Sequence, residues 1–215
     1  MYKLLLSGVA WLALAAPALA QQAGCIGVGG VNTVPQTGVT CSQEPTTPTY
    51  GATSIGLVPA ASATDIACLS GSATKIVRLQ MVKISGSGTA ISIPVLLKKN
   101  ASLDTGGTAA TSTALPVAYA LDSANPTASA AVTAFTANPT INDTAPGILD
   151  NGNLGLVATT VGAAVQPYIL WDYQERNYNQ APVLRSAAQQ LCVNLNATSP
   201  TALLNVTFRW TEAPQ

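Results

Sequence analysis

Apolar and polar residues alternate along several short stretches of this chain, which is the pattern of half-buried β-strands. The clearest stretch is 203–211, where the apolar positions are Leu204, Val206, Phe208 and Trp210. Residues 191–196 alternate in the same way, with Leu191, Val193 and Leu195 on one face. Turn-forming residues over 196–201 separate the two stretches, so we expect them to pair as a terminal hairpin.

Two earlier stretches alternate with an interruption. In 75–85 the apolar positions shift from Val77 and Leu79 to Val82 and Ile84. This shift predicts a β-bulge or a strand buried on both sides. In 91–99 the alternation is regular, but Pro94 has no N–H to donate, which predicts an edge strand or a bulge there.

Most of the remaining chain consists of turn-forming residues and further predicted strands. Strands are expected over 128–136 and 154–160, and the turn-rich segment 138–153 is expected to connect them. Helix signals are scarce. Seven or eight short strands separated by turns indicate an all-β fold, an antiparallel β-sandwich that is jelly-roll-like or immunoglobulin-like.

The chain divides into three parts by composition. Residues 1–20 form a leader, residues 21–50 form an extended arm rich in Gly, Pro and Thr, and residues 51–215 form the sandwich domain. One domain of this size has room for a large single core.

The leader has the layout of a signal peptide. Lys3 precedes the apolar run Leu4–Ala16, and Ala18-Leu19-Ala20 has the small-x-small form of a cleavage site. Two alternatives stay open: an uncleaved apolar segment buried in an assembly, and lipoprotein processing at Cys25. No comparable apolar segment follows, so no stable membrane span is expected after removal of the leader.

The four cysteines fit an exported protein. They are Cys25, Cys41, Cys68 and Cys192, and the chain has neither a C-x-x-C motif nor a histidine to complete a zinc site. Of the three possible connectivities we favour Cys25–Cys41, which closes a loop in the arm, and Cys68–Cys192, which ties an early strand to a late one. In a reducing cytoplasm all four would instead be small buried hydrophobes.

Composition argues against catalysis. Only 8% of the 215 residues are charged and none is histidine, which leaves few groups for acid–base, nucleophilic or metal chemistry. We therefore expect no enzyme, no cofactor and no metal site, and the absence of a basic patch argues against nucleic acid. Lys98 and Lys99 are interpreted as a solvated strand end.

One stretch offers a possible interaction surface. Trp171, Tyr173 and Tyr178 alternate with polar residues, as in surfaces that bind sugars or proteins. Asp172 and Glu175 lie in the same stretch, but one loop rarely supplies both carboxylates of a glycosidase, so a hydrolase is the last-ranked reading.

Several phrases of the sequence resemble a pattern in small tailed-phage virion-associated proteins, a largely uncharacterised group. They are Gly56–Ala61, Thr64–Ile66, Gly71–Lys75, Val77-Arg78, Pro94–Lys98, Thr105–Thr108, Val193–Asn196 and Trp210–Glu212. By analogy with phage cement proteins, the resemblance implies a β-sandwich that trimerises on a capsid. The leader departs from that pattern.

Two functions from different classes follow as expectations. The first is a non-enzymatic virion component, a trimeric capsid decoration protein whose partners are capsid or other virion proteins. The alternative is a secreted bacterial surface or adhesion module that binds a glycan or a protein.

Overall fold

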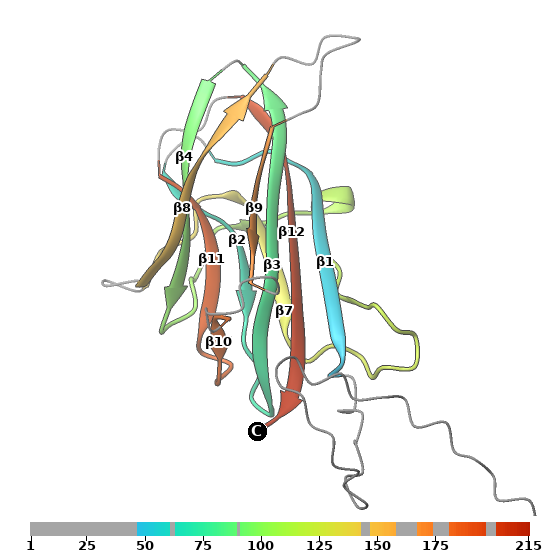
Figure 1. Ribbon diagram of the computed structural model, residues 1–215. Helices are drawn as coiled ribbons and strands as arrows, with labels where there is room; N and C mark the ends of the chain where they lie inside the picture. The colour runs from blue at the N-terminus through green and yellow to red at the C-terminus, as the bar shows by residue number, and fades with distance from the viewer. Residues whose placement is uncertain are drawn as a thin grey trace, which may run out of the picture. The chain divides into compact units, whose positions relative to one another are not determined.

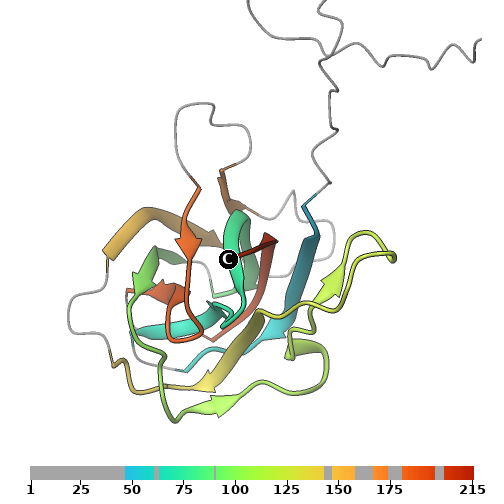
Figure 2. The same ribbon diagram turned by 90° about the horizontal axis from the view of Figure 1, so that it is seen from below.

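The computed structural model describes residues 47–60, 63–89, 91–142, 147–157, 167–173, 181–196 and 201–215. These residues form twelve β-strands and one short 3-10 helix, η1 (Ser112–Ala114). The strands build two antiparallel sheets that pack face to face (Figure 1; Figure 2). The prediction of an all-β antiparallel sandwich is confirmed, and its jelly-roll-like character stays a prediction.

Long strands in the first sheet surround the strand that comes last in the chain. In order across the sheet the strands are β10 (Val183–Leu184), β3 (Lys75–Gly88), β12 (Ala202–Pro214), β1 (Thr49–Leu57) and β6 (Tyr119–Ala120), and β9 (Tyr168–Asp172) also pairs with β3. β12 therefore pairs along its length with β3 on one side and β1 on the other.

The second sheet has the same design, with a late strand inserted between two early ones. Its order is β5 (Thr108–Ala109), β7 (Ala131–Ala137), β2 (Thr64–Ser70), β11 (Gln190–Leu195), β4 (Ile91–Asn100) and β8 (Gly147–Leu156). β11 pairs with β2 and with β4.

The core lies between the two sheets and is built from alternate residues of each strand. The predicted inward set of β12, Leu204, Val206, Phe208 and Trp210, is completely or almost completely buried, which confirms that prediction. Tyr50 of β1 stacks on Trp210 with ring centroids 5.9 Å apart. The two rings are among the largest fully buried side chains of the described residues.

The expected terminal hairpin is wrong. β11 belongs to the second sheet and β12 to the first, so the chain changes sheets between Asn196 and Thr201. A turn signal says that a strand ends, but it does not say which sheet the next strand joins.

The bulge predicted in β3 is confirmed. Arg209 pairs with Met81 and Trp210 pairs with Leu79, which leaves Gln80 as the extra residue. This single insertion lets both Leu79 and Val82 face the core.

The prediction for Pro94 is wrong, because β4 is paired on both sides and its bulge lies at Leu97/Lys98. The carbonyl of Pro94 accepts a hydrogen bond from Asn196 N at 3.0 Å, past the last residue of β11. The nitrogen of Pro94 faces the same side, beyond the last β11–β4 pair, Leu195 with Val95, so its missing N–H interrupts no pair of that ladder.

Residues 147–153 form a strand where a turn-rich connection was expected. They belong to β8, which pairs only with β4 and so forms an edge of the second sheet. Polar residues and glycine are tolerated on an edge strand because one side and much of one face meet solvent.

The sandwich domain begins two residues earlier than the predicted residue 51. β1 begins at Thr49, and Tyr50 is buried, so these two residues belong to the sandwich and not to the arm. The leader and residues 21–46 lie outside the described residues. Within the described ranges, no helix is both long enough and apolar enough to span a membrane.

Candidate functional site

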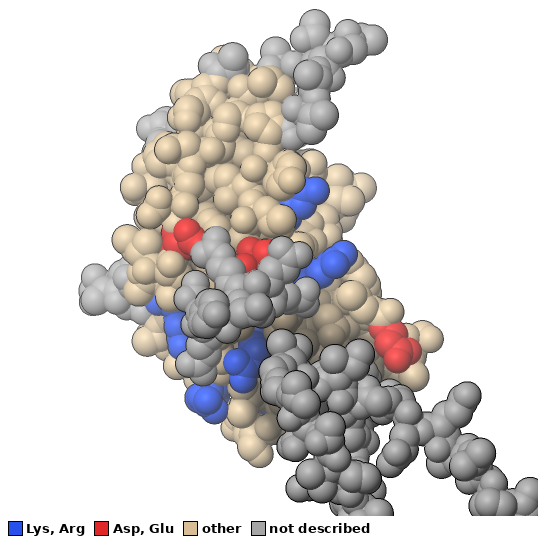
Figure 3. Space-filling model, in the orientation of Figure 1, with Lys and Arg blue, Asp and Glu red and all other residues tan. Residues whose placement is uncertain are grey.

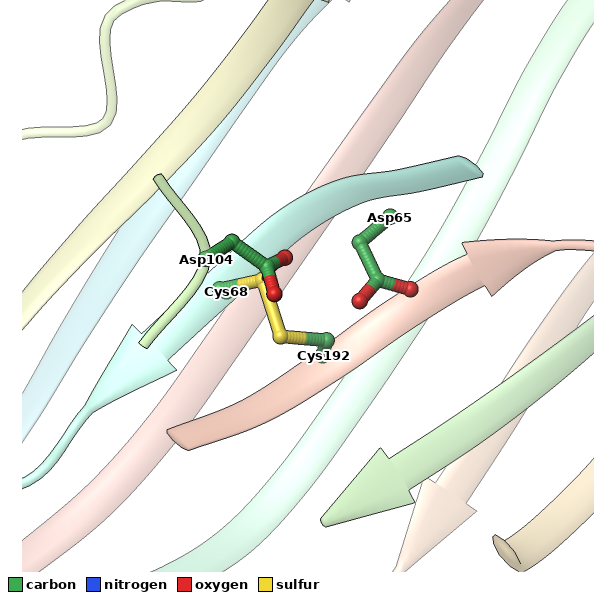
Figure 4. A group of neighbouring side chains, drawn as sticks. All are labelled: Asp65, Cys68, Asp104 and Cys192. Carbon is green, nitrogen blue, oxygen red and sulfur yellow. A yellow bond between two sulfur atoms is a disulfide. The ribbon is translucent and has the colours of Figure 1, made fainter. Parts of the chain in front are cut away.

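The second sheet buries polar side chains on the face directed away from the core. Every residue of β11 is buried, although its side chains point alternately to the two faces. Leu191, Val193 and Leu195 belong to the core cluster, whereas Cys192 and Asn194 lie on the opposite face. Asp104, on the segment between β4 and β5, lies against the disulfide at that face (Figure 4).

An ion pair between Lys98 and Asp65 is the centre of this polar cluster. Lys98 Nζ lies 2.8 Å from Asp65 Oδ1, and the two side chains are 6% and 0% exposed. Asp65 belongs to β2 and Lys98 to β4, so the pair reaches across the intervening strand β11. The prediction of a solvated strand end is therefore wrong for Lys98, because its side chain is buried and paired with Asp65.

Two amides complete the surroundings of the Asp65 carboxylate. Asn194 Nδ2 donates to Oδ1 at 2.6 Å, and Asn100 Nδ2 donates to Oδ2 at 3.4 Å. A buried carboxylate needs such partners, since removing a charge from water costs several kcal/mol per ion. The cluster thus holds the carboxyl group of Asp65 in one orientation.

A β-bulge brings Asp65 to this face of the sheet. Ala67 pairs with Val193 and Asp65 pairs with Asn194, so Ile66 is the extra residue. Without the bulge, Asp65 and Cys68 would point to opposite faces, because they are three residues apart. The sequence contains no signal that specifies this insertion.

A disulfide between Cys68 and Cys192 lies beside the ion pair. The two residues are direct partners in the β2–β11 ladder, and their Cα atoms are 4.1 Å apart. The predicted link between an early and a late strand is confirmed. Cys25 and Cys41 lie outside the described residues.

The carboxyl group of Asp104 faces the Asp65 carboxylate and the disulfide (Figure 4). Burial, and then the charge and hydrogen bonding of Asp65, raise the pKa of Asp104 to about 6. The Gln190 amide and the Lys98 charge act in the opposite direction, although Gln190 Nε2 makes no hydrogen bond of good geometry with the described residues. Asp104 therefore holds a proton more readily than an ordinary aspartate.

Asp65, Cys68, Asp104 and Cys192 place their oxygen and sulfur atoms within 4.8 Å of one another (Figure 4). The donor set does not fit a metal ion while the disulfide is intact. Metal ligation by cysteine requires a thiolate, and Asp65 is already paired with Lys98. Cys68 Sγ lies 3.7 Å from Asp104 Oδ2, a contact without a hydrogen bond because a disulfide sulfur carries no proton.

A second buried carboxylate, that of Glu212, lies at the first sheet. Trp210 Nε1 donates to Oε1 at 3.0 Å, and the backbone N–H groups of Ser129 and Ala130 donate as well. Burial by itself raises the pKa of Glu212, but the hydrogen bonds from Ser129, Trp210 and Ala130 outweigh it and hold the pKa below its usual value. This carboxylate fastens the segment before β7 to β12.

The aromatic surface expected around β9 is not formed as predicted. Trp171 is 4% exposed and belongs to the core, because it pairs with the inward-facing Val82 of β3. Tyr173 packs against the core, and Tyr178 lies outside the described residues. The exposed aromatic residue of this strand is Tyr168.

Exposed apolar side chains gather at one end of the sandwich, which we call the uncharged end. It consists of Ile55, Val58, Ile91, Tyr168, Leu170 and Leu203. Tyr168 and Leu203 flank β3, where they pair with Ser85 and Ser87. Lys83 borders this surface, since it pairs with Leu170 and its Nζ lies 4.9 Å from the centroid of the Tyr168 ring. Among the described residues, the uppermost part of the face in Figure 3 shows no charged side chain.

The chain matches no known protein family, no curated protein and no solved structure.

Sequence reasoning missed the polar cluster. Lys98 and Asn100 share one face of β4, and Cys192 and Asn194 share one face of β11. The sequence therefore indicated two rows of side chains that point away from the core. Their burial was not visible, because it depends on contacts among residues of β2, β4 and β11 that are distant in the sequence.

Proposed function

We propose that this protein is a non-enzymatic structural component of a phage virion, a decoration protein that packs on the capsid as a trimer. The observation that carries the proposal is the uncharged end. A surface of exposed apolar side chains on a sheet, with Lys83 at its border, favours burial against another protein.

The sandwich itself favours a supporting role. Its core joins both sheets in one cluster, and the disulfide and the ion pair connect strands β2, β11 and β4. Such a body keeps an exposed surface in a fixed shape, which suits repeated docking on a regular shell. Stable assemblies of this kind bury about 2,000 Å² or more in total.

The test is association with virus particles from a source culture. Leu170→Glu and Leu203→Glu each place a charge in the uncharged end, and we expect less of either variant to sediment with particles in a density gradient. Val117→Glu is the matched control, because Val117 is exposed elsewhere. Undiminished co-sedimentation of both variants would overturn the role of this surface.

The arm is tested by a deletion. In the proposal it crosses to a neighbouring subunit and adds a strand to its sheet. Removal of residues 21–46 preserves β1, which begins at Thr49. We expect weaker trimerisation or docking by a chain that still folds, and unchanged particle association would count against this role.

The disulfide favours a second candidate, a secreted surface or adhesion module, because disulfides persist in oxidising compartments. N-terminal sequencing separates the two functions. Free protein in the medium that begins at Gln21 supports secretion, whereas the chain in purified particles supports the virion.

A further inference from the structure

We propose that Lys98 and Asp65 condense to an intramolecular isopeptide bond, with Asp104 as the group that relays the proton. The bond would be a covalent modification of the sheet itself, and its formation does not depend on the partner that the protein docks on.

The reacting groups are already in contact. Lys98 Nζ lies 2.8 Å from Asp65 Oδ1, so the amine is held beside the carboxyl group whose carbon it would attack. Holding two groups in this way replaces a bimolecular step with an intramolecular one, which lowers the barrier in well-oriented cases.

The site is also buried, and exclusion of bulk solvent favours condensation. Asp65 is fully buried, and the side chain of Lys98 is 6% exposed. A buried ion pair pays a desolvation cost of several kcal/mol per ion, and an amide removes both charges.

The step balances without any further reactant. In the neutral form of the pair, the proton of Lys98 has passed to Asp65, and an amine faces a carboxylic acid. The Nζ–Cγ bond forms and one Cγ–O bond breaks. The departing oxygen leaves as water, with the proton of the acid and one proton from Nζ.

Asp104 is placed to carry that second proton. One of its carboxyl oxygens lies within 4.8 Å of an oxygen of Asp65 (Figure 4). In its protonated form it delivers a proton to the departing oxygen and then accepts one from Nζ, so it ends in the form in which it began. The raised pKa of Asp104 keeps a fraction of this group protonated near neutral pH, as a proton relay requires.

The two amides stabilise the charge that develops during the attack. Asn194 Nδ2 and Asn100 Nδ2 both donate to the oxygens of Asp65, one to each. Donors fixed around a developing oxyanion in a dry site are worth several kcal/mol each. These residues are positioning groups, and they do not change covalently.

The bond would complete a set of covalent connections in the second sheet. The disulfide joins β2 to β11, and the isopeptide bond would join β2 to β4 across β11. After reduction of the disulfide, β2 and β4 would stay covalently joined, with β11 held between them by hydrogen bonds alone.

The test is the intact mass of the full chain, measured under denaturing conditions after reduction, with the N-terminus determined by sequencing. We expect a mass lower than the sequence predicts by one water molecule, and a branched fragment that joins Asp65 to Lys98 after digestion. A full mass with a free Lys98 side chain would overturn the proposal. A mass lower by one ammonia molecule would overturn the assignment to Asp65, since it would make an asparagine the acceptor.

Variants identify the participants. Lys98→Arg should keep the full mass, and Lys83→Arg, at an exposed lysine, should still lose water. Asp65→Asn should lose ammonia in place of water, a readout that works even if Lys98→Arg does not fold. Complete cross-linking in Asp104→Asn would overturn the relay by Asp104.

Discussion

Trp210 Nε1 donates a hydrogen bond of 3.0 Å to Glu212 Oε1 from the same face of strand β12. The two residues are separated by one position, so the strand geometry itself sets their side chains next to each other. The indole satisfies its only donor within the protein, and the carboxylate gains one of its several donors. The largest ring of the core and its most thoroughly hydrogen-bonded carboxylate therefore depend on each other.

Glu212→Gln should destabilise the fold by about 1–3 kcal/mol, because donors from Ser129 and Ala130 lose a charged acceptor. Urea unfolding followed by fluorescence measures the free energy of unfolding. Asp122→Asn, at an exposed carboxylate in a turn, is the control and should change that free energy little. Equal effects of the two substitutions would contradict the assignment.

The same carboxylate predicts how stability depends on pH. The pKa of Glu212 is lowered in the folded protein, so its contribution is fully present above the unfolded value, near 4.5, and is lost as the pH falls through the folded pKa. The free energy of unfolding should therefore decrease more steeply below this pH in the wild type than in Glu212→Gln. Parallel curves from about pH 7 to about pH 2 would be inconsistent with this interpretation.

Replacing both disulfide cysteines, Cys68→Ala with Cys192→Ala, should lower the free energy of unfolding by about 2–5 kcal/mol. The bridged residues are 124 positions apart, so the unfolded chain gains much freedom when the bond is absent. The urea midpoint of the double variant, compared with the oxidised wild type, measures the effect. Identical midpoints would mean that the disulfide contributes nothing to stability.

Gly71→Ala should destabilise the fold by about 1–3 kcal/mol through overpacking. A Cβ atom at this position would lie only 2.3 Å from the backbone oxygen of Ser186, which cannot move as a side chain would. Gly147→Ala is the matched control, because its Cβ would meet Lys99 O at an ordinary 3.7 Å. Thermal unfolding of the two variants should differ, and a similar loss in both would point to a general effect of lost glycine.

Tyr50→Phe removes the hydrogen bond from the Tyr50 hydroxyl to Pro126 O, which is 2.9 Å long, and keeps the stacking on Trp210. We expect a loss of about 1 kcal/mol in the free energy of unfolding. Tyr119→Phe, at an exposed tyrosine, should have little effect. A larger loss in Tyr119→Phe would show that the hydroxyl of Tyr50 is not the important one.

The sequence was informative where one face of a strand is apolar. The alternation in β12 and the shift between Leu79 and Val82 both follow from burial against the core, so they predicted the inward residues and the bulge at Gln80. The pairing of Cys68 with Cys192 could be predicted for a different reason, because four cysteines allow only three connectivities.

The polar cluster was hidden for two physical reasons. The extra residue Ile66 rotates Asp65 to the face that carries Cys68, and nothing in the local composition requires it. The burial of Lys98 depends on its pairing with Asp65, which lies two strands away in the sheet. Assignment of a strand to a sheet is equally non-local, which is why β11 and β12 were expected to pair.

The position of β11 and β12 between strands made much earlier has a consequence for synthesis. On the ribosome, β1 and β3, like β2 and β4, emerge without the neighbour that later separates them. Pairing over such long stretches of chain is slow. We expect the nascent polypeptide to remain incompletely folded until residues beyond 190 have been translated. During that interval its unpaired strand edges would be accessible to chaperones.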